Sequence, residues 1–141
     1  MKVSEIMSRH VEIIPPDQSL DEAAGQMRDL NIGLIPICDG DRLVGMLTDR
    51  DIVVRAVAEG RDPRDTPVSD VMTPQVRYCF EDQDVAEAAR MMEEFQIRRL
   101  PILNRSKQLV GIVSLGDVAV RAGDDAVSGD TLKGVSEPSV R

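Results

Sequence analysis

Residues 43–51 read Leu-Val-Gly-Met-Leu-Thr-Asp-Arg-Asp, and residues 109–117 read Leu-Val-Gly-Ile-Val-Ser-Leu-Gly-Asp. Both stretches begin with an apolar segment of strand character, pass through a hydroxyl residue and reach an aspartate three positions later. A shift of 66 residues relates them, and it places Asp51 on Asp117. Such a pattern, present twice, indicates a duplicated unit in which a strand leads directly into a helix.

The duplication extends outward from these two stretches. With a shift of 65 residues, Val-Ser-Glu-Ile-Met-Ser at positions 3–8 aligns with Val-Ser-Asp-Val-Met-Thr at positions 68–73. Matching residues continue at 22–27 against 87–92, and at 36–37 against 101–102. The chain is therefore an internal repeat of roughly 60 residues, and any fold must accommodate two copies.

Each copy shows the same order of elements, β-α-β-β-α. A short β-branched strand is followed by a helix behind a capping pattern, Ser19-x-x-Glu22 in one copy and Asp84-x-x-Glu87 in the other. Two apolar strands around a polar turn and a closing helix complete the unit. For the first copy the predicted segments are residues 11–14, 19–30, 34–38, 43–47 and 48–58. For the second they include residues 84–95, 100–103, 109–113 and 114–122.

The sequence thus predicts an α+β fold with two units packed sheet to sheet around a pseudo-twofold axis. We expect a first domain at residues 1–60 and a second at residues 68–122. Residues 61–67, polar and containing two prolines, form the expected linker. Residues 123–141, rich in glycine, serine and aspartate, are expected to be a polar tail with no fold of its own.

Composition excludes several classes of function. The 141 residues carry a net charge of −8, which disfavours nucleic-acid backbones, and Tyr78, Phe80 and Phe95 are too few aromatics for base stacking. No apolar run is long enough to span a membrane, and residues 1–14 do not resemble a signal peptide, so we expect a cytoplasmic protein. The single histidine and the absence of a catalytic constellation predict neither a metal site nor an enzyme.

The repeated motif has the chemistry of a nucleotide site. A hydroxyl at a helix start, Thr48 or Ser114, suits an anion such as phosphate, because free N–H groups gather there. A carboxylate in the first turn, Asp51 or Asp117, suits the two vicinal hydroxyls of a ribose. The preceding glycine lets some group approach the strand closely. The same Thr-x-x-Asp pattern also begins helices as a simple cap, so the structural and functional interpretations both stay open.

The duplicated unit resembles a tandem pair of CBS domains, the Bateman module, over residues 1–122. The Met-Ser and Met-Thr openings, the Leu-Ile-Pro-Ile and Arg-Leu-Pro-Ile strands and the Leu-Val-Gly-x-x-[Thr/Ser]-x-x-Asp motif carry this resemblance. It implies binding of an adenosyl ligand, namely AMP, ADP, ATP, NAD or S-adenosylmethionine, in clefts between the copies. The resemblance also implies a homodimer, and no cofactor that the fold requires.

Carried over by position, the resemblance assigns two clefts. The first takes Thr48, Arg50 and Asp51 from one copy, with Arg98 and Arg99 supplied by the opposite copy for phosphate. The second takes Ser114 and Asp117. Since stacking aromatics are scarce, aliphatic and strand residues would surround the adenine, and those assigned to the second cleft are Ile32, Val76 and Tyr78.

We expect the first cleft to hold a phosphorylated nucleotide, and the second to bind more weakly or to prefer a less charged adenosyl group. For the arginine pair, an ordinary solvated pair is the alternative. The predicted function is therefore to sense energy or metabolite state and to modulate an effector protein. Two other classes stay open: a ligand-independent dimeric interaction module, and a redox or metal sensor acting through Cys38 and Cys79.

Overall fold

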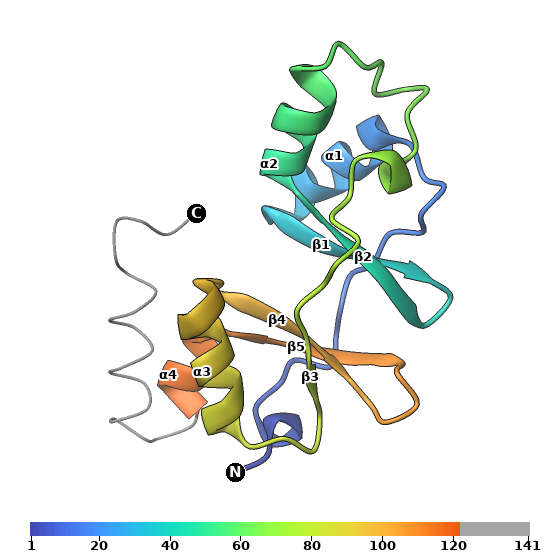
Figure 1. The fold of residues 1–141 in the computed structure, drawn as a ribbon. Helices are drawn as coiled ribbons and strands as arrows, with labels where there is room; N and C mark the ends of the chain where they lie inside the picture. The colour runs from blue at the N-terminus through green and yellow to red at the C-terminus, as the bar shows by residue number, and fades with distance from the viewer. Residues whose placement is uncertain (122–141) are drawn as a thin grey trace. The chain divides into compact units, whose positions relative to one another are not determined.

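The computed structural model describes residues 1–121, which form two compact units (Figure 1). The central unit is the continuous segment Glu12–Val76, and the terminal unit combines Met1–Val11 with the chain from Arg77 onward. Each unit has its own hydrophobic core. The predicted polar tail at residues 123–141 lies outside the described residues.

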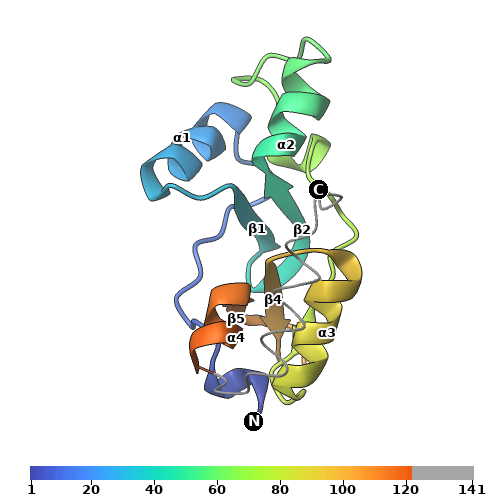
Figure 2. The same cartoon turned by 90° about the vertical axis from the view of Figure 1, so that its left-hand side faces the viewer.

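In the central unit, helix α1 (Leu20–Leu30) precedes an antiparallel hairpin of β1 (Leu34–Asp39) and β2 (Arg42–Thr48). The hairpin turns at Gly40, whose φ of +66° lies in the left-handed region that glycine enters without strain. Strand β2 continues into α2 (Asp49–Asp51), which runs on as the π-helix η2 (Ile52–Val57). The 3₁₀ helix η3 (Val68–Asp70) completes the unit, and Figure 2 shows α1 and α2 beside the hairpin.

In the terminal unit, the 3₁₀ helix η1 (Val3–Glu5) accompanies strand β3 (Cys79–Phe80), helix α3 (Val85–Phe95) and strands β4 (Arg99–Leu103) and β5 (Leu109–Ser114). Helix α4 (Leu115–Arg121) follows β5 directly. The sheet order is β3-β4-β5, with a parallel first pair and an antiparallel second pair. The mixed helix and sheet content confirms the predicted α+β class.

The predicted strand at residues 11–14 is wrong in extent. Only Ile14 pairs, in a parallel bridge to Ile37, where Ile14 N–H donates to the Pro36 carbonyl at 3.1 Å. Pro15 and Pro16 have no N–H group, so a ladder cannot continue past Ile14. The second copy lacks such prolines and forms the short strand β3 at the equivalent place.

The two capping patterns have different outcomes. Ser19 precedes α1 without capping it, because its hydroxyl donates to Asp21 Oδ1 at 2.6 Å instead of accepting a backbone N–H. Asp84 does cap α3, since its Oδ1 accepts from Ala86 N–H at 2.9 Å. The predicted Ser19–Glu22 box is therefore wrong, and of the predicted Asp84–Glu87 box only the Asp84 cap forms, because Glu87 Oε2 accepts from Gln83 Nε2 at 2.6 Å. The buried residues of the two helices are Leu20, Ala23 and Met27 in α1, and Val85, Ala88, Ala89 and Met92 in α3.

The two repeats exchange their opening segments, residues 3–8 and residues 68–73. Val3, Ile6 and Met7 of the first repeat are buried in the core of the terminal unit, which holds the second repeat's sheet. Val68 and Val71 of the second repeat are buried in the core of the central unit. The sequence repeat therefore does not coincide with the compact units, whose limits fall at 11/12 and 76/77.

A methionine of each opening segment lies against a strand glycine. A Cβ on Gly45 would collide with Met72 Sδ, and one on Gly111 would lie 2.5 Å from Met7 Sδ. The neighbouring residues hydrogen-bond to the strand after that glycine: Thr73 to Met46, and Ser8 to Ile112. The sequence predicts that some group approaches these glycines closely, and the group found there is a methionine of the chain itself.

Candidate functional site

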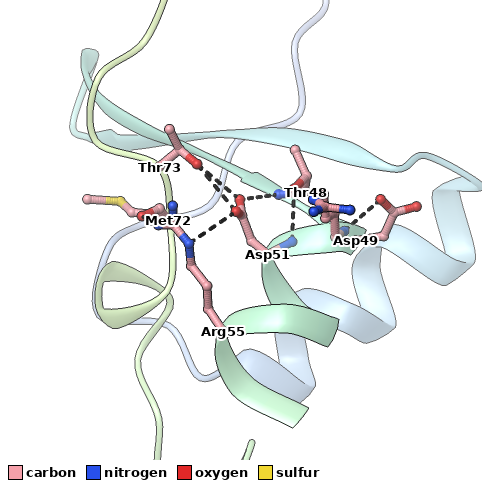
Figure 3. A network of polar contacts seen from close by, with 7 residues as sticks. Thr48, Asp49, Asp51, Arg55, Met72 and Thr73 are labelled. Atoms are coloured by element: carbon pink, nitrogen blue, oxygen red, sulfur yellow. Dashed lines mark hydrogen bonds and ion pairs between the residues drawn. The ribbon is translucent and has the colours of Figure 1, made fainter. Parts of the chain in front are cut away.

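The start of α2 is a complete capping box (Figure 3). Asp51 N–H donates to Thr48 Oγ1 at 3.0 Å, and Thr48 N–H donates to Asp51 Oδ2 at 3.0 Å. The box forms because β2 ends at Thr48 in an extended conformation, and its two hydrogen bonds satisfy backbone N–H groups that have no partner within the helix. The structural interpretation of Thr-x-x-Asp is confirmed, and a capped helix end can still present polar groups to a ligand.

The Asp51 carboxylate has further partners that the motif does not contain. Thr73 Oγ1 donates to both of its oxygens, at 3.3 Å and 3.4 Å, and Arg55 Nε lies 3.8 Å from Oδ1. Arg55 also donates through Nη1 to the Met72 carbonyl at 3.1 Å. The Asp51 side chain is only 10% exposed. Sequence reasoning missed Thr73 and Arg55, although Thr73 stands in the repeated opening segment.

The second copy builds a similar but more open box. Ser114 N–H donates to Asp117 Oδ2 at 2.9 Å, and Asp117 N–H donates to Ser114 Oγ at 3.1 Å. Asp117 is partly exposed, whereas Asp51 is buried. Ser8 is the sequence counterpart of Thr73, and its hydroxyl donates to the His10 carbonyl at 3.4 Å. The two copies therefore differ in what surrounds the aspartate.

The arginines assigned to phosphate are exposed. Arg50 follows the Thr48 cap, and its N–H donates to Asp49 Oδ1 at 2.8 Å. Arg99 pairs with Ser114 across β4 and β5, and the Arg98 carbonyl accepts from Leu115 N–H at 2.8 Å. Within the terminal unit, Arg98 and Arg99 thus lie beside the start of α4. Their assignment to the site of Thr48 and Asp51 stays a prediction.

The residues assigned to adenine fall in different units. Ile32 and Val76 belong to the central unit, where Ile32 is partly buried against the core. Tyr78 belongs to the terminal unit and meets Phe80 edge to face, with 5.5 Å between the ring centroids. Their joint role around an adenine also stays a prediction.

The central unit has a pocket of about 450 Å³ that sequence reasoning missed. Met27 and Asn31 of the α1 end, Ile32 and Gly33 of the following turn, and Asp49 of α2 contribute to its lining. A Cβ on Gly33 would lie 3.0 Å from Asp49 Oδ2, so only glycine leaves the Asp49 carboxylate undisturbed. Ile32 is the one predicted site residue that lines this pocket.

Both cysteines, Cys38 and Cys79, are buried free thiols. Desolvation by burial raises the pKa of Cys38 and of Cys79 to about 11 in each case. The thiolate is the reactive form of cysteine, and it is scarce near neutral pH at such a pKa. This argues against a redox sensor built on these thiols.

Within residues 1–121, no three side chains of His, Cys, Asp or Glu gather as they would around a metal ion. In this same part of the chain, no helix has the length and apolar character that crossing a bilayer demands.

Similarity to known proteins covers nearly the whole chain. The "CBS domain-containing protein YhcV" of Bacillus subtilis is 40% identical over 138 residues, which cover 98% of this chain and 97% of YhcV. "Hypoxic response protein 1" of Mycobacterium tuberculosis is 38% identical over 124 residues, covering 87% of this chain and 86% of that protein. A crystal structure of "Hypoxic Response Protein I", described as "with two coordinated zinc ions", is 38% identical and matches with a TM-score of 0.77 over 84% of this chain and 97% of that chain.

A further solved structure is the CBS domain pair of protein MJ0100, described as "in complex with 5'-methylthioadenosine and S-adenosyl-L-methionine". It is 29% identical, with a TM-score of 0.73 over 87% of this chain and all of the other. A family model for the CBS domain matches twice, at residues 3–57 and 68–122. Because the model covers both repeats and these relatives align along most of the chain, the protein belongs to the CBS domain family, as a tandem pair of CBS domains.

Proposed function

We propose that this CBS pair is a non-enzymatic regulatory protein that binds an adenosyl ligand and transmits its binding state to an effector protein. The observation that carries the proposal is the duplicated strand-to-helix box, in which a hydroxyl and a carboxylate stand together at Thr48 and Asp51, and again at Ser114 and Asp117. A carboxylate accepts the two hydroxyls of a ribose, and the ends of capped helices favour anions. Support also comes from the MJ0100 pair, whose description names two adenosyl ligands.

The decisive experiment is thermal unfolding of the full chain with and without AMP, ADP, ATP, NAD and S-adenosylmethionine. A ligand that binds only the native state raises the unfolding midpoint by mass action. At a free concentration of about 100 times Kd, one site adds about 2.7 kcal/mol, which is easily measured. No shift with any of the five compounds would remove the proposal and leave the ligand-independent module.

Site variants identify the residues involved. Asp51→Ala and Asp117→Ala should each lower the number of nucleotides retained per chain in native mass spectrometry. Retention unchanged in both variants would contradict the assignment of these carboxylates. Unfolding of the ligand-free variants must be measured alongside, because Asp51 also closes the cap on Thr48.

Arg98 and Arg99 are proposed to supply the phosphate-binding charge. Arg99→Ala should then weaken binding of ATP more than binding of S-adenosylmethionine, since guanidinium groups pair with phosphate. Arg42→Ala, which removes another exposed arginine of a strand, is a matched control. If Arg99→Ala lowers the affinity for ATP and for S-adenosylmethionine equally, Arg99 has a structural role.

A homodimer is the second part of the proposal. Val53, Val54 and Val57 on η2 are 58%, 45% and 68% exposed, which is unusual for three apolar side chains on one short helix. The double variant Val53→Glu/Val57→Glu should lower the mass found by light scattering from that of a dimer to that of a monomer. The same three valines favour the alternative, a dimeric interaction module without ligand, if all five compounds fail to bind.

A further inference from the structure

The Asp51 carboxylate already accepts hydrogen bonds from the Thr48 N–H group and the Thr73 hydroxyl (Figure 3). Two vicinal hydroxyls contact a carboxylate best when each donates to one of its oxygens. Thr73 Oγ1 lies 3.3 Å from Oδ1 and 3.4 Å from Oδ2, so it stands almost equally far from both. A donor in that place blocks a bidentate partner.

Burial reinforces this obstruction. The Asp51 side chain is only 10% exposed, and Thr48, Thr73 and Arg55 surround its carboxylate. Thr48 holds Oδ2 through the backbone N–H of the cap, and Arg55 is itself half exposed at the edge. Thr73 is therefore the group that a ligand must move to reach both carboxylate oxygens.

Thr73 can move its hydroxyl without moving its backbone. Its N–H donates to the Met46 carbonyl at 2.8 Å, and its carbonyl accepts from Met46 N–H at 2.9 Å. These two bonds fix the main chain, whereas rotation about χ1 takes the hydroxyl from one staggered position to another. Its contact with Asp51 is one long hydrogen bond divided between two acceptors, which is weaker than two well-formed bonds from a diol.

We propose that the Thr73 hydroxyl is a gate on the Asp51 carboxylate, so that an adenosyl ligand uses this carboxylate only after displacing Thr73. The inference rests on the proposed function and adds a regulatory element to the first of its two sites. The second site has no such gate among the described side chains, because Ser8 directs its hydroxyl to the His10 carbonyl. Thr73 thus sets the affinity of the first site.

The test is titration calorimetry of AMP, ATP and S-adenosylmethionine into the full chain carrying Asp117→Ala, which removes the acceptor proposed for the second site so that the titration reports on the first. Adding Thr73→Ala should tighten binding about fivefold, the equivalent of about 1 kcal/mol for a hydrogen bond that no longer has to be broken. Thr73→Ser restores the hydroxyl and should restore the original affinity. Ser8→Ala is the matched control in the other copy and should change nothing.

Binding that is equal or weaker in Thr73→Ala overturns the gate while the proposed function stands. Absence of binding to the chain without substitutions and to every variant overturns both. A second measurement uses the chain without substitutions: the Thr73 methyl resonance and its couplings, recorded while AMP is added, should report a change of χ1 rotamer. A complex in which Thr73 keeps its rotamer also overturns the proposal.

Discussion

At the residue scale, the glycine of the repeated motif is explained by a side chain of the same protein. Gly45 and Gly111 are buried, and each lies against the sulfur of a methionine from an opening segment. Methionine fits such a space because its unbranched side chain adapts to irregular gaps. The motif therefore encodes packing of methionine on glycine as well as a helix start.

Gly45→Ala should destabilise the protein by about 1–3 kcal/mol, as overpacked cores do, because the new Cβ has no space beside Met72 Sδ. Urea unfolding followed by circular dichroism measures the change. The double variant Gly45→Ala/Met72→Ala should lose less unfolding free energy than the two single variants lose together, since removing the sulfur removes the collision. Strict additivity would contradict the packing explanation.

The two thiols predict how stability changes in alkali. Burial raises the pKa of Cys38 and of Cys79 from 9.0 to about 11, so the native state keeps its protons at pH values where the unfolded chain loses them. The stability due to the neutral thiols is complete below pH 9 and falls as the pH rises from 9 to 11. The slope is about 1.4 kcal/mol per pH unit for each thiol.

Unfolding free energies measured from pH 8 to pH 11 in the presence of a reductant would show this decline. Cys38→Ala and Cys79→Ala should each reduce the slope of unfolding free energy against pH by a similar amount. A curve of unchanged slope in both variants would mean that the thiols ionise as freely in the native state as in the unfolded chain.

At the element scale, equal sequence patterns give unequal elements. The closing helix of the first copy becomes the π-helix η2, where Ala58 N–H donates to the Val53 carbonyl five residues earlier, whereas its counterpart α4 is α-helical. The sequence predicts ordinary helices at both places. Helical periodicity in the sequence locates a helix and its buried face. Whether the helix has α-type or π-type hydrogen bonds depends on tertiary packing, which a local sequence pattern does not show.

The two capping positions give an element-scale prediction. Asp84→Ala should lower the unfolding midpoint more than Ser19→Ala, because Asp84 accepts the Ala86 N–H and Ser19 caps nothing. The hydrogen bond from Ala86 N–H is the main cause that lowers the pKa of Asp84, so this cap persists above pH 4 and weakens as acid protonates it. Thermal melts of both variants at pH 7 and at successively lower pH test the order, and the difference between the two variants should shrink as the pH falls.

At the scale of the whole chain, the sequence predicts the duplication, the α+β class and the boxes at Thr48 and Ser114, all of which the structure contains. It does not predict the exchange of the opening segments. Residues 3–8 and 68–73 are so alike that the sequence does not indicate which core each segment joins. Thr73 was missed as a partner of Asp51 for the same reason, because it reaches Asp51 from the other repeat.

The exchange predicts which fragment folds. A fragment of residues 12–76 contains the entire central unit, including the buried Val68 and Val71, and should give a dispersed NMR spectrum. A fragment of residues 1–60, the first repeat with its own opening segment, lacks these core residues and should stay unfolded. Folding of the second fragment but not the first would show that the opening segments return to their own repeats.

The order of protein synthesis gives this exchange a kinetic consequence. Residues 12–76 are contiguous, so the central unit can fold as soon as these residues have left the ribosome. Residues 1–11 emerge before them but find their packing partners only when the sheet and helices beyond Arg77 have been made. During translation, Val3, Ile6 and Met7 therefore stay exposed until the rest of the terminal unit has been made, and chaperones can bind them in that time.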